Sequence, residues 1–272
     1  MNKQQLLIFL EELKKRPNSA LSQNFLVDDN IAAKIVKTAA VSPGDTVLEI
    51  GSGPGTLTEH LLEKGARVFA VETDPLFAKE LLRFQTPDER LIVFHADILK
   101  FDLSTLPSPI KVVANLPYHI TTPIFEHLLE KKELFSSFTL MVQKELAERL
   151  LAKPSTKEYG SLTLFLQFHT QISASFPVSA SCFYPKPKVD SKVLRFDILP
   201  SRNVESAPFF SLVRRAFQQR RKMLRASLKS LYPAKTIEEA LANIHLPTDA
   251  RPETLSLDAW IAFYTLLIKK TA

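Results

Sequence analysis

The 272-residue sequence contains one cysteine, few glycines and no long uninterrupted hydrophobic run. A single cysteine excludes an intrachain disulfide and argues against a cysteine-rich metal site, so we expect no bound metal. The apolar residues from Leu6 to Leu10 are followed at once by Glu11 and Glu12, which makes this run too short for a secretory signal or a membrane span. These absences predict a cytoplasmic protein that does not associate with a membrane, and we expect a monomer.

Three of the six glycines fall within five consecutive positions, as Gly51, Gly53 and Gly55. They follow the apolar run Thr46–Leu48 and precede a helical pattern. Glycine permits a positive φ and lets a ligand approach the backbone in front of the helix N-terminus. The spacing G-x-G-x-G differs from the G-x-G-x-x-G of dinucleotide-binding proteins, which disfavours NAD as the ligand.

Acidic residues stand at the ends of two further apolar runs. Glu72 ends the run from Arg67 to Val71, 21 residues after Gly51, where a carboxylate can bind two ribose hydroxyls. Asp97 follows the run from Leu91 to Phe94 and could accept a hydrogen bond from an adenine amino group. One such acid alone is more often a cap or a turn residue, but polar groups at successive strand ends favour a ligand site.

The tetrapeptide Asn115-Leu116-Pro117-Tyr118 ends a fourth apolar run, from Lys111 to Ala114. An asparagine oxygen and a neighbouring backbone carbonyl can accept both N–H bonds of a planar amino group, and proline keeps that carbonyl out of a helix. Tyrosine offers a flat face on which a base can stack. We therefore predict that Asn115, Leu116, Pro117 and Tyr118 form the catalytic segment, against the alternatives of an ordinary turn and a core aromatic.

The net charge of +6 is concentrated in residues 201–232, which carry eight basic residues and one acid, Glu205. From Ser211 to Leu231 the apolar residues recur at helical spacing, which predicts one amphipathic helix. Its unmixed positive charge favours a surface that contacts phosphates over a solvated face or a membrane-surface helix. The residues expected to make these nucleic-acid contacts are Arg214, Arg215, Arg221, Lys222, Arg225 and Lys229.

Several of these motifs together resemble one family, the ribosomal small-subunit RNA adenine N6,N6-dimethyltransferases (the KsgA type). The resemblance implies S-adenosyl-L-methionine as cofactor and dimethylation of N6 of two adjacent adenosines in 16S ribosomal RNA. It also implies the immature 30S subunit, late in assembly, as partner. Ser22 stands where the family usually has glycine. The matching segments are Gln23–Leu26, Glu49–Thr58, Val71–Asp74, Ala96–Asp97, Asn115–Pro123 and Pro187–Ser191.

The resemblance also assigns roles to individual residues. Tyr118 and Phe183 would stack on the target base. The cofactor-binding residues would be Asn24, Leu26, Gly51, Gly53, Gly55, Glu72, Asp97 and Asn115. We assign no chemistry to His119, and we interpret Cys182 as a packed thiol.

Strand-like and helical segments alternate from Thr46 to Gln143, and two later strands, Ile172–Val178 and Ser191–Leu199, would close the sheet antiparallel. This order predicts an α/β fold with a Rossmann-like class I methyltransferase sheet and a small all-helical C-terminal domain. We expect residues 1–200 to form the cofactor-binding catalytic domain, with an N-terminal helical segment, and residues 201–272 to form a basic domain that binds RNA or the ribosome.

Two other functions stay open. A large-subunit ribosomal RNA adenine N6-methyltransferase of the antibiotic-resistance type shares the tetrapeptide, although the segment from Pro187 to Ser191 disfavours it. A non-catalytic ribosome-assembly factor would not need the glycine loop, Glu72, Asp97 and Asn115. DNA adenine and protein glutamine N-methyltransferases use Asn-Pro-Pro-Tyr instead, and Leu116 disfavours them.

Overall fold

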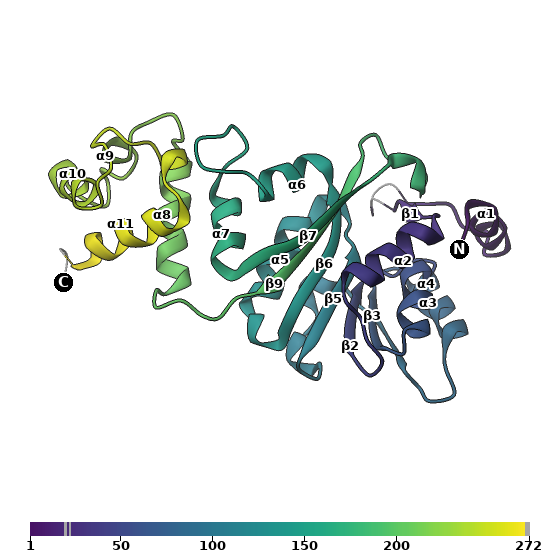
Figure 1. The fold of residues 1–272 in the computed structure, drawn as a ribbon. Coiled ribbons are helices and arrows are strands. Elements are labelled where there is room, and N and C mark those ends of the chain that lie inside the picture. The colour runs from purple at the N-terminus through teal and green to yellow at the C-terminus, as the bar shows by residue number, and fades with distance from the viewer. Residues whose placement is uncertain (19–20, 22, 270–272) are drawn as a thin grey trace. The chain divides into compact units, whose positions relative to one another are not determined.

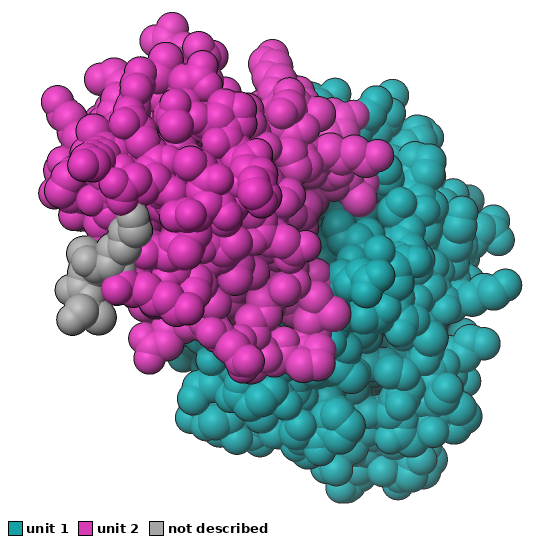
Figure 2. Space-filling model, turned by 60° about the vertical axis from the view of Figure 1, so that its left-hand side comes forward, with its two compact units in different colours: residues 1–147, 171–198 teal, residues 148–170, 199–272 magenta. Residues whose placement is uncertain are grey.

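The fold is that of a computed structural model, which describes residues 1–18, 21 and 23–269. Ser22, which stands where the family usually has glycine, lies outside the described residues. The chain divides into two compact units, which Figure 2 shows in different colours. Unit 1 comprises residues 1–147 and 171–198, and unit 2 comprises residues 148–170 and 199–272.

Unit 1 is built on a seven-stranded sheet with the order β4-β3-β2-β5-β6-β9-β7 (Figure 1). The strands from β4 to β6 are parallel, and β9 pairs antiparallel with β6, which confirms the Rossmann-like sheet and its antiparallel end. The strands of this sheet are β2 (Thr46–Ile50), β3 (Arg67–Glu72), β4 (Leu91–His95), β5 (Ile110–Asn115), β6 (Phe135–Gln143), β7 (Thr170–Val178) and β9 (Ser191–Ile198). A separate two-stranded ladder joins β1 (Phe25–Leu26) to β8 (Phe183–Tyr184).

Three helices of unit 1, α1, α2 and α4, begin at polar residues whose side chains cap them. Asp28 caps α2 by accepting from the Ile31 backbone N–H at 3.1 Å, and Asp74 caps α4 through Leu76 in the same way. The helices of unit 1 are α1 (Lys3–Glu12), α2 (Asp29–Thr38), α3 (Thr56–Glu63), α4 (Pro75–Glu80) and α5 (Thr121–Glu130), and α6 (Lys144–Leu150) spans the boundary between the units. Short 3-10 helices are η2 (Leu81–Phe84), η3 (Ile98–Lys100), η4 (Leu103–Thr105), η5 (Tyr118–Ile120), η6 (Lys132–Leu134), η7 (Ala180–Cys182) and η8 (Pro252–Thr254).

The strand order places a crevice between β2 and β5. The chain passes from β2 to β3 and β4 on one side, and then crosses back to β5 on the other side of β2. In open parallel sheets the loops diverge at such a switch point, and ligands bind there at the carboxyl ends of the strands.

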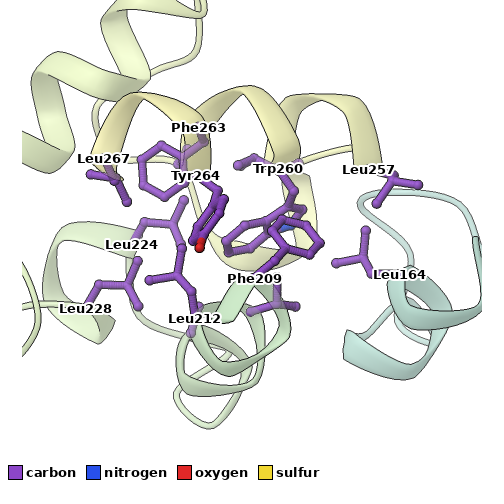
Figure 3. Packing of buried hydrophobic residues seen from close by; sticks show 14 of the residues in the cluster. Leu164, Phe209, Leu212, Leu224, Leu228, Leu257, Trp260, Phe263, Tyr264 and Leu267 are labelled. Carbon is purple, nitrogen blue, oxygen red and sulfur yellow. The ribbon is translucent and has the colours of Figure 1, made fainter. Parts of the chain in front are cut away.

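Unit 2 is helical apart from the residue at the start of β7, and aromatic side chains fill its interior. Figure 3 shows Phe209 of α8 and Tyr264 of α11 among these side chains, with ring centroids 5.5 Å apart. Trp260 is fully buried in the same cluster. The helices of this unit are α7 (Ser161–His169), α8 (Ser206–Phe217), α9 (Leu224–Ser227), α10 (Ala234–Asn243) and α11 (Leu257–Lys269).

The structure groups residues 148–170 with this unit, although the sequence places a boundary at residue 200. The reason lies in α7, whose Leu164 and Phe168 are buried in the same hydrophobic cluster as Phe209. The roles expected for residues 1–200 and 201–272 stay a prediction.

The single helix predicted from Ser211 to Leu231 is wrong. Helix α8 ends at Phe217 and α9 begins at Leu224. A continuous helix would turn Arg220 toward the same side as Phe217 and Leu224, because residues three and four apart share a helix face. The break avoids placing a guanidinium on the buried face, and Leu231 is 52% exposed instead of packed.

Candidate active site

A pocket lies at the carboxyl ends of β2, β3 and β5, within unit 1. Its described walls come from residues 21 and 23–26, from the glycine loop after β2, from the end of β3 and from the tetrapeptide after β5. Of the residues predicted to bind a cofactor, this pocket brings together Asn24, Leu26, Gly51, Gly53, Glu72 and Asn115.

The glycine loop leaves room for a ligand at its first glycine. Gly51 has φ +68°, and a Cβ there would have Pro117 Cδ, at 4.0 Å, as its nearest neighbour. Gly55 differs, because its Cβ would meet Phe84 Cε2 at 2.3 Å and because it does not belong to the described lining of the pocket. Gly51 therefore fits a cofactor-contacting role, whereas Gly55 permits the turn into α3 and its packing.

Glu72 is held by the backbone around it. Its two carboxylate oxygens accept from the N–H groups of Gly53 and Asp74, each at 2.8 Å. Burial raises the pKa of Glu72, and these two hydrogen bonds oppose that rise. Each oxygen has a further lone pair with which the side chain can accept from hydroxyl groups.

Asp97 occupies the next strand end, but it does not belong to the described lining of the pocket. Its side chain caps η3 by accepting from the Leu99 N–H at 3.0 Å. The neighbouring Ala96 N–H donates to the Glu72 carbonyl at 3.0 Å. Asp97 therefore lies close to the end of β3, which carries Glu72. The predicted contact between Asp97 and an adenine amino group stays a prediction.

Glu49 is a pocket residue to which the sequence assigned no role. It is 1% exposed at the end of β2, and it accepts from the Thr58 hydroxyl at 2.6 Å. Burial raises the pKa of Glu49 to about 7, against the hydrogen bonds that it receives. A charged residue inside an apolar run directly before Gly51 was the available signal.

Asn115 lies at the end of β5 with a fixed side-chain orientation. Its Nδ2 donates to the Asn24 backbone carbonyl at 3.1 Å. Because a carbonyl can only accept, the amide nitrogen must face Asn24 and the amide oxygen must face the other way. Leu116 beside it is 2% exposed, and its N–H donates to the Met141 carbonyl at 3.2 Å, so the tetrapeptide stays connected to β6 beyond the end of β5.

Tyr118 is half-buried, and its hydroxyl forms a hydrogen bond with a residue of another segment that resembles the family, Pro187–Ser191. The Tyr118 hydroxyl lies 2.8 Å from the hydroxyl of Ser191, at the start of β9. Burial raises the pKa of Tyr118, so the phenol stays protonated and does not serve as a base. The hydrogen bond fixes the ring without covering its faces.

Phe183, the second predicted stacking residue, is only 3% exposed. It pairs with Leu26 in the β1–β8 ladder and packs in the hydrophobic cluster of unit 1. Leu26, which lines the inner pocket, belongs to the same cluster, and the described linings of the two hollows at this edge do not include Phe183.

A second, more open hollow of about 690 Å³ adjoins the first, because Gln23, Asn24 and Tyr118 line both. Lys186 and Lys188 are exposed on its wall. Such a groove, with cations beside an aromatic face, suits a nucleic-acid strand whose base enters the inner pocket. His119 also lines the groove.

The single thiol is not prepared for nucleophilic chemistry. Cys182 Sγ lies 3.6 Å from Asp28 Oδ2. Burial and this carboxylate raise the pKa of Cys182, which keeps the sulfur protonated.

The basic residues predicted to contact RNA lie in unit 2 and differ in their surroundings. Arg225 forms an ion pair with Glu238 at 2.6 Å, so its charge is already matched. Arg215 donates to Gln218 at 3.1 Å and to Ser230 at 3.2 Å. The exposed members of the set are Arg214, Arg221, Lys222 and Lys229.

Arg220, outside the predicted set, has a structural role within unit 2. Its guanidinium donates to the carbonyls of Thr156, at 2.8 Å, and Lys157, at 2.5 Å. These bonds fix the loop before α7.

Among the described residues, no helix combines the length and the apolar character needed to cross a membrane.

Comparison with known proteins agrees with this architecture. The sequence model of the family "Ribosomal RNA adenine dimethylase" matches residues 14–269. The chain is 48% identical over 268 residues to the ribosomal RNA small subunit methyltransferase A of Protochlamydia amoebophila, covering 96% of this chain and 94% of that protein. The protein of the same name from Chlamydia felis is 45% identical over 272 residues, which cover 97% of this chain and 94% of that protein.

Two solved structures are similar over almost their whole length. A dimethyladenosine transferase from Plasmodium falciparum is 25% identical with a TM-score of 0.75, covering 91% of this chain and 98% of that one. The 23S rRNA methyltransferase ErmE is 28% identical with a TM-score of 0.70, covering 90% of this chain and 100% of that one. With a family match over nearly the whole sequence and relatives close to half identical, the chain belongs to the ribosomal RNA adenine dimethylase family.

Proposed function

We propose that this protein transfers methyl groups from S-adenosyl-L-methionine to N6 of two adjacent adenosines in 16S ribosomal RNA, within the immature 30S subunit. The single observation that carries the proposal is the orientation of Asn115, whose amide oxygen is directed away from Asn24 at the edge of the pocket. The relatives named small subunit methyltransferase A support the choice of RNA.

The residues of the inner pocket suit the cofactor chemically. The backbone at Gly51 is open to close approach, since a Cβ there would meet nothing nearer than 4.0 Å, and the fixed carboxylate of Glu72 can accept from two ribose hydroxyls. Asn24, Leu26 and Gly53 would complete the walls around it. When bound, the cofactor supplies an electrophilic methyl group on its sulfonium.

The residues after β5 act on the acceptor. The amine of adenine is a poor nucleophile, because its lone pair is delocalised into the ring. The Asn115 oxygen and the Leu116 carbonyl would each accept one N–H bond, which favours rehybridisation and directs the lone pair. The main contributions are positioning and hydrogen bonding rather than proton abstraction by a strong base.

Tyr118 would hold the base by stacking on its ring, with Ser191 fixing the ring. The phosphates of the strand would meet Lys186 and Lys188 at the outer groove. Exposed cations of unit 2, such as Arg214 and Arg221, would contact other phosphates of the ribosomal particle.

The test is methyl transfer from labelled cofactor to immature small subunits, followed by mass spectrometry of the RNA. We expect N6,N6-dimethyladenosine from the parent protein and a rate at least about a hundredfold lower for Asn115→Ala, since one oriented acceptor is worth on the order of 3 kcal/mol in such sites. The exposed Asn30→Ala is a matched control and should keep full activity.

Two outcomes would contradict the proposal. Transfer to large-subunit RNA but not to small subunits would favour the activity named for ErmE, to which the chain is similar. Binding to particles without any methyl incorporation would leave only a role in assembly.

A further inference from the structure

We infer that Lys15, Gln23 and Asp74 form a positioning cluster for the proposed reaction, which orients Asn115 through the backbone of Asn24. None of the three is proposed to touch the adenine. We name these three residues the Asp74 cluster. The inference rests on the proposed function for its effect on rate, but its geometry concerns this chain alone.

The cluster is centred on a buried carboxylate. Asp74 is 4% exposed, and one of its oxygens, Oδ2, receives both Lys15 Nζ at 2.5 Å and Gln23 Nε2 at 3.1 Å. The other oxygen caps α4 through the Leu76 N–H at 3.1 Å. Burial alone would raise the pKa of Asp74, but the bonds from Lys15 and Gln23 outweigh it and hold the pKa below its ordinary value.

Lys15 reaches Asp74 because the end of α1 is fixed. The Lys15 N–H donates to the Leu10 carbonyl at 2.9 Å, and its ammonium lies 5.0 Å from the centre of the Phe77 ring. Phe77 and Leu10 are buried in one small cluster with Leu6 and Phe25, which packs α1 near the start of α4.

Gln23 connects this cluster to the pocket. Its side-chain oxygen accepts from the Asn18 N–H at 2.8 Å, while its side-chain nitrogen donates to Asp74, so both ends of the amide are engaged. The next residue is Asn24, and the two after it form β1, paired with Phe183 and Tyr184. The Asn24 carbonyl is thus held between the Asp74 cluster on one side and the β1–β8 ladder on the other.

That carbonyl determines which way Asn115 faces. It accepts from Asn115 Nδ2 at 3.1 Å, and without it the amide could rotate and present a nitrogen where an acceptor is needed. The turn that carries Asp74 also carries Glu72, since the Asp74 N–H donates to Glu72 Oε1 at 2.8 Å. The Asp74 cluster therefore links the residue that would hold ribose to the residue that would hold the acceptor amine.

The test uses Lys15→Met, which keeps an unbranched side chain over Phe77 and removes the ammonium. Asp74 itself is unsuitable, because its loss also removes the cap of α4. We expect kcat to fall about tenfold with little change in KM for RNA, and Lys15→Arg to restore most of it by renewing the ion pair. Lys14→Met, at an exposed neighbouring position, is the control and should keep the parent kcat.

A second readout needs neither cofactor nor RNA. The sequence has seven asparagines, so the side-chain amide signals of protein labelled with 15N-asparagine are few enough to resolve by NMR, and the signal missing from Asn115→Ala identifies Asn115. We expect this signal to shift in Lys15→Met and to return toward its parent position in Lys15→Arg.

The outcomes separate the inference from the proposed function. An Asn115 signal unmoved by Lys15→Met, or a Lys15→Arg protein as impaired as Lys15→Met, would overturn the positioning role. A parent protein that transfers no methyl group would refute the proposed function, while the shift of the Asn115 signal would still decide whether the cluster orients this side chain.

Discussion

The two units keep their polar groups in different places. Among the described residues, the three buried carboxylates are Glu49, Glu72 and Asp74, and all three belong to unit 1. Unit 2 has an interior of aromatic and aliphatic side chains, and the basic residues of 201–232 lie at its surface or half-buried. Burying a charge is costly unless hydrogen bonds satisfy it, so unit 1 gives up stability to build a site. A substitution at one of the three buried carboxylates of unit 1 should therefore alter the chemistry of the site as well as stability, whereas one in the interior of unit 2 should alter stability alone.

The largest effect on stability is expected for Trp260→Ala in unit 2. Trp260 is fully buried, packs against Phe263 at 5.9 Å and donates its indole N–H to the Pro252 carbonyl at 3.3 Å. Truncating a buried aromatic costs about 3–5 kcal/mol, to be measured by denaturant unfolding. Leu231→Ala, at an exposed position, should change stability by less than about 0.5 kcal/mol. If folded Trp260→Ala protein also lost about 3–5 kcal/mol of binding free energy for the cofactor, the distinction between the two units would be wrong.

The next effect is the pH dependence caused by Glu49 in unit 1. Its pKa is raised from 4.5 to about 7 in the folded protein, mainly by burial. As the pH rises through this window, the unfolded chain loses the proton and the folded protein keeps it. The free energy of unfolding should therefore fall with rising pH, by on the order of 3 kcal/mol.

Glu49→Gln should make this slope clearly smaller, because glutamine keeps an oxygen that can accept from Thr58 and never ionises. Glu72, whose pKa burial also raises, should leave a residual slope of the same sign. Unfolding measured between pH 4.5 and 8 for parent and variant provides the check. Glu11→Gln, at an exposed position, is the matched control and should leave the slope unchanged. A parent-like slope in Glu49→Gln would mean that another group causes it.

The site in unit 1 was largely predictable from the sequence. Apolar runs marked the strands, and the carboxyl ends of parallel strands meet at one edge of a sheet, so Gly51, Glu72 and Asn115 had to converge. Asp97 and Gly55 follow the same pattern, but neither belongs to the described lining of the pocket, so their contacts with a cofactor stay a prediction. Asp97 also caps η3, and Gly55 also allows close packing against Phe84. Glu72 and Asp97 each accept from the backbone N–H two residues later, and only Glu72 belongs to the described lining of the pocket. Nothing in the local sequence shows this difference.

The parts that could not be predicted depend on partners far away in the chain. The spacing of Val213, Phe217 and Leu224 is compatible with one continuous helix and also with two shorter ones. The break between α8 and α9 is stabilised by a hydrogen bond from the Leu224 N–H to the Ala250 carbonyl, at 2.9 Å. Arg225 resembles its basic neighbours in the sequence, and only the fold brings Glu238 beside it. The Asp74 cluster likewise joins residues that lie more than fifty positions apart.

A smaller effect should separate the cations at the surface of unit 2. Arg221→Ala removes an exposed charge, so we expect the affinity for the ribosomal particle to fall several-fold and the salt slope to drop by about 0.7–0.9, the value of one phosphate contact. Arg225→Ala should change both less, because Glu238 already matches its charge. Binding measured over a range of salt concentrations tests this, and equal effects of the two variants would show that the ion pair opens on binding.

The smallest effect is expected within the site itself, from Tyr118→Phe. The variant keeps the ring that would stack on the target base and loses the hydroxyl that lies 2.8 Å from Ser191. One hydrogen bond contributes about 1 kcal/mol, so the single-turnover rate should fall about fivefold, whereas Tyr118→Ala should lower it far more. Ser191→Ala should lower the single-turnover rate by about as much as Tyr118→Phe. The double variant should be little slower than either single variant, because both substitutions remove the same hydrogen bond. Additive losses in the double variant would instead mean that Ser191 acts on the reaction by a route other than the tyrosine ring.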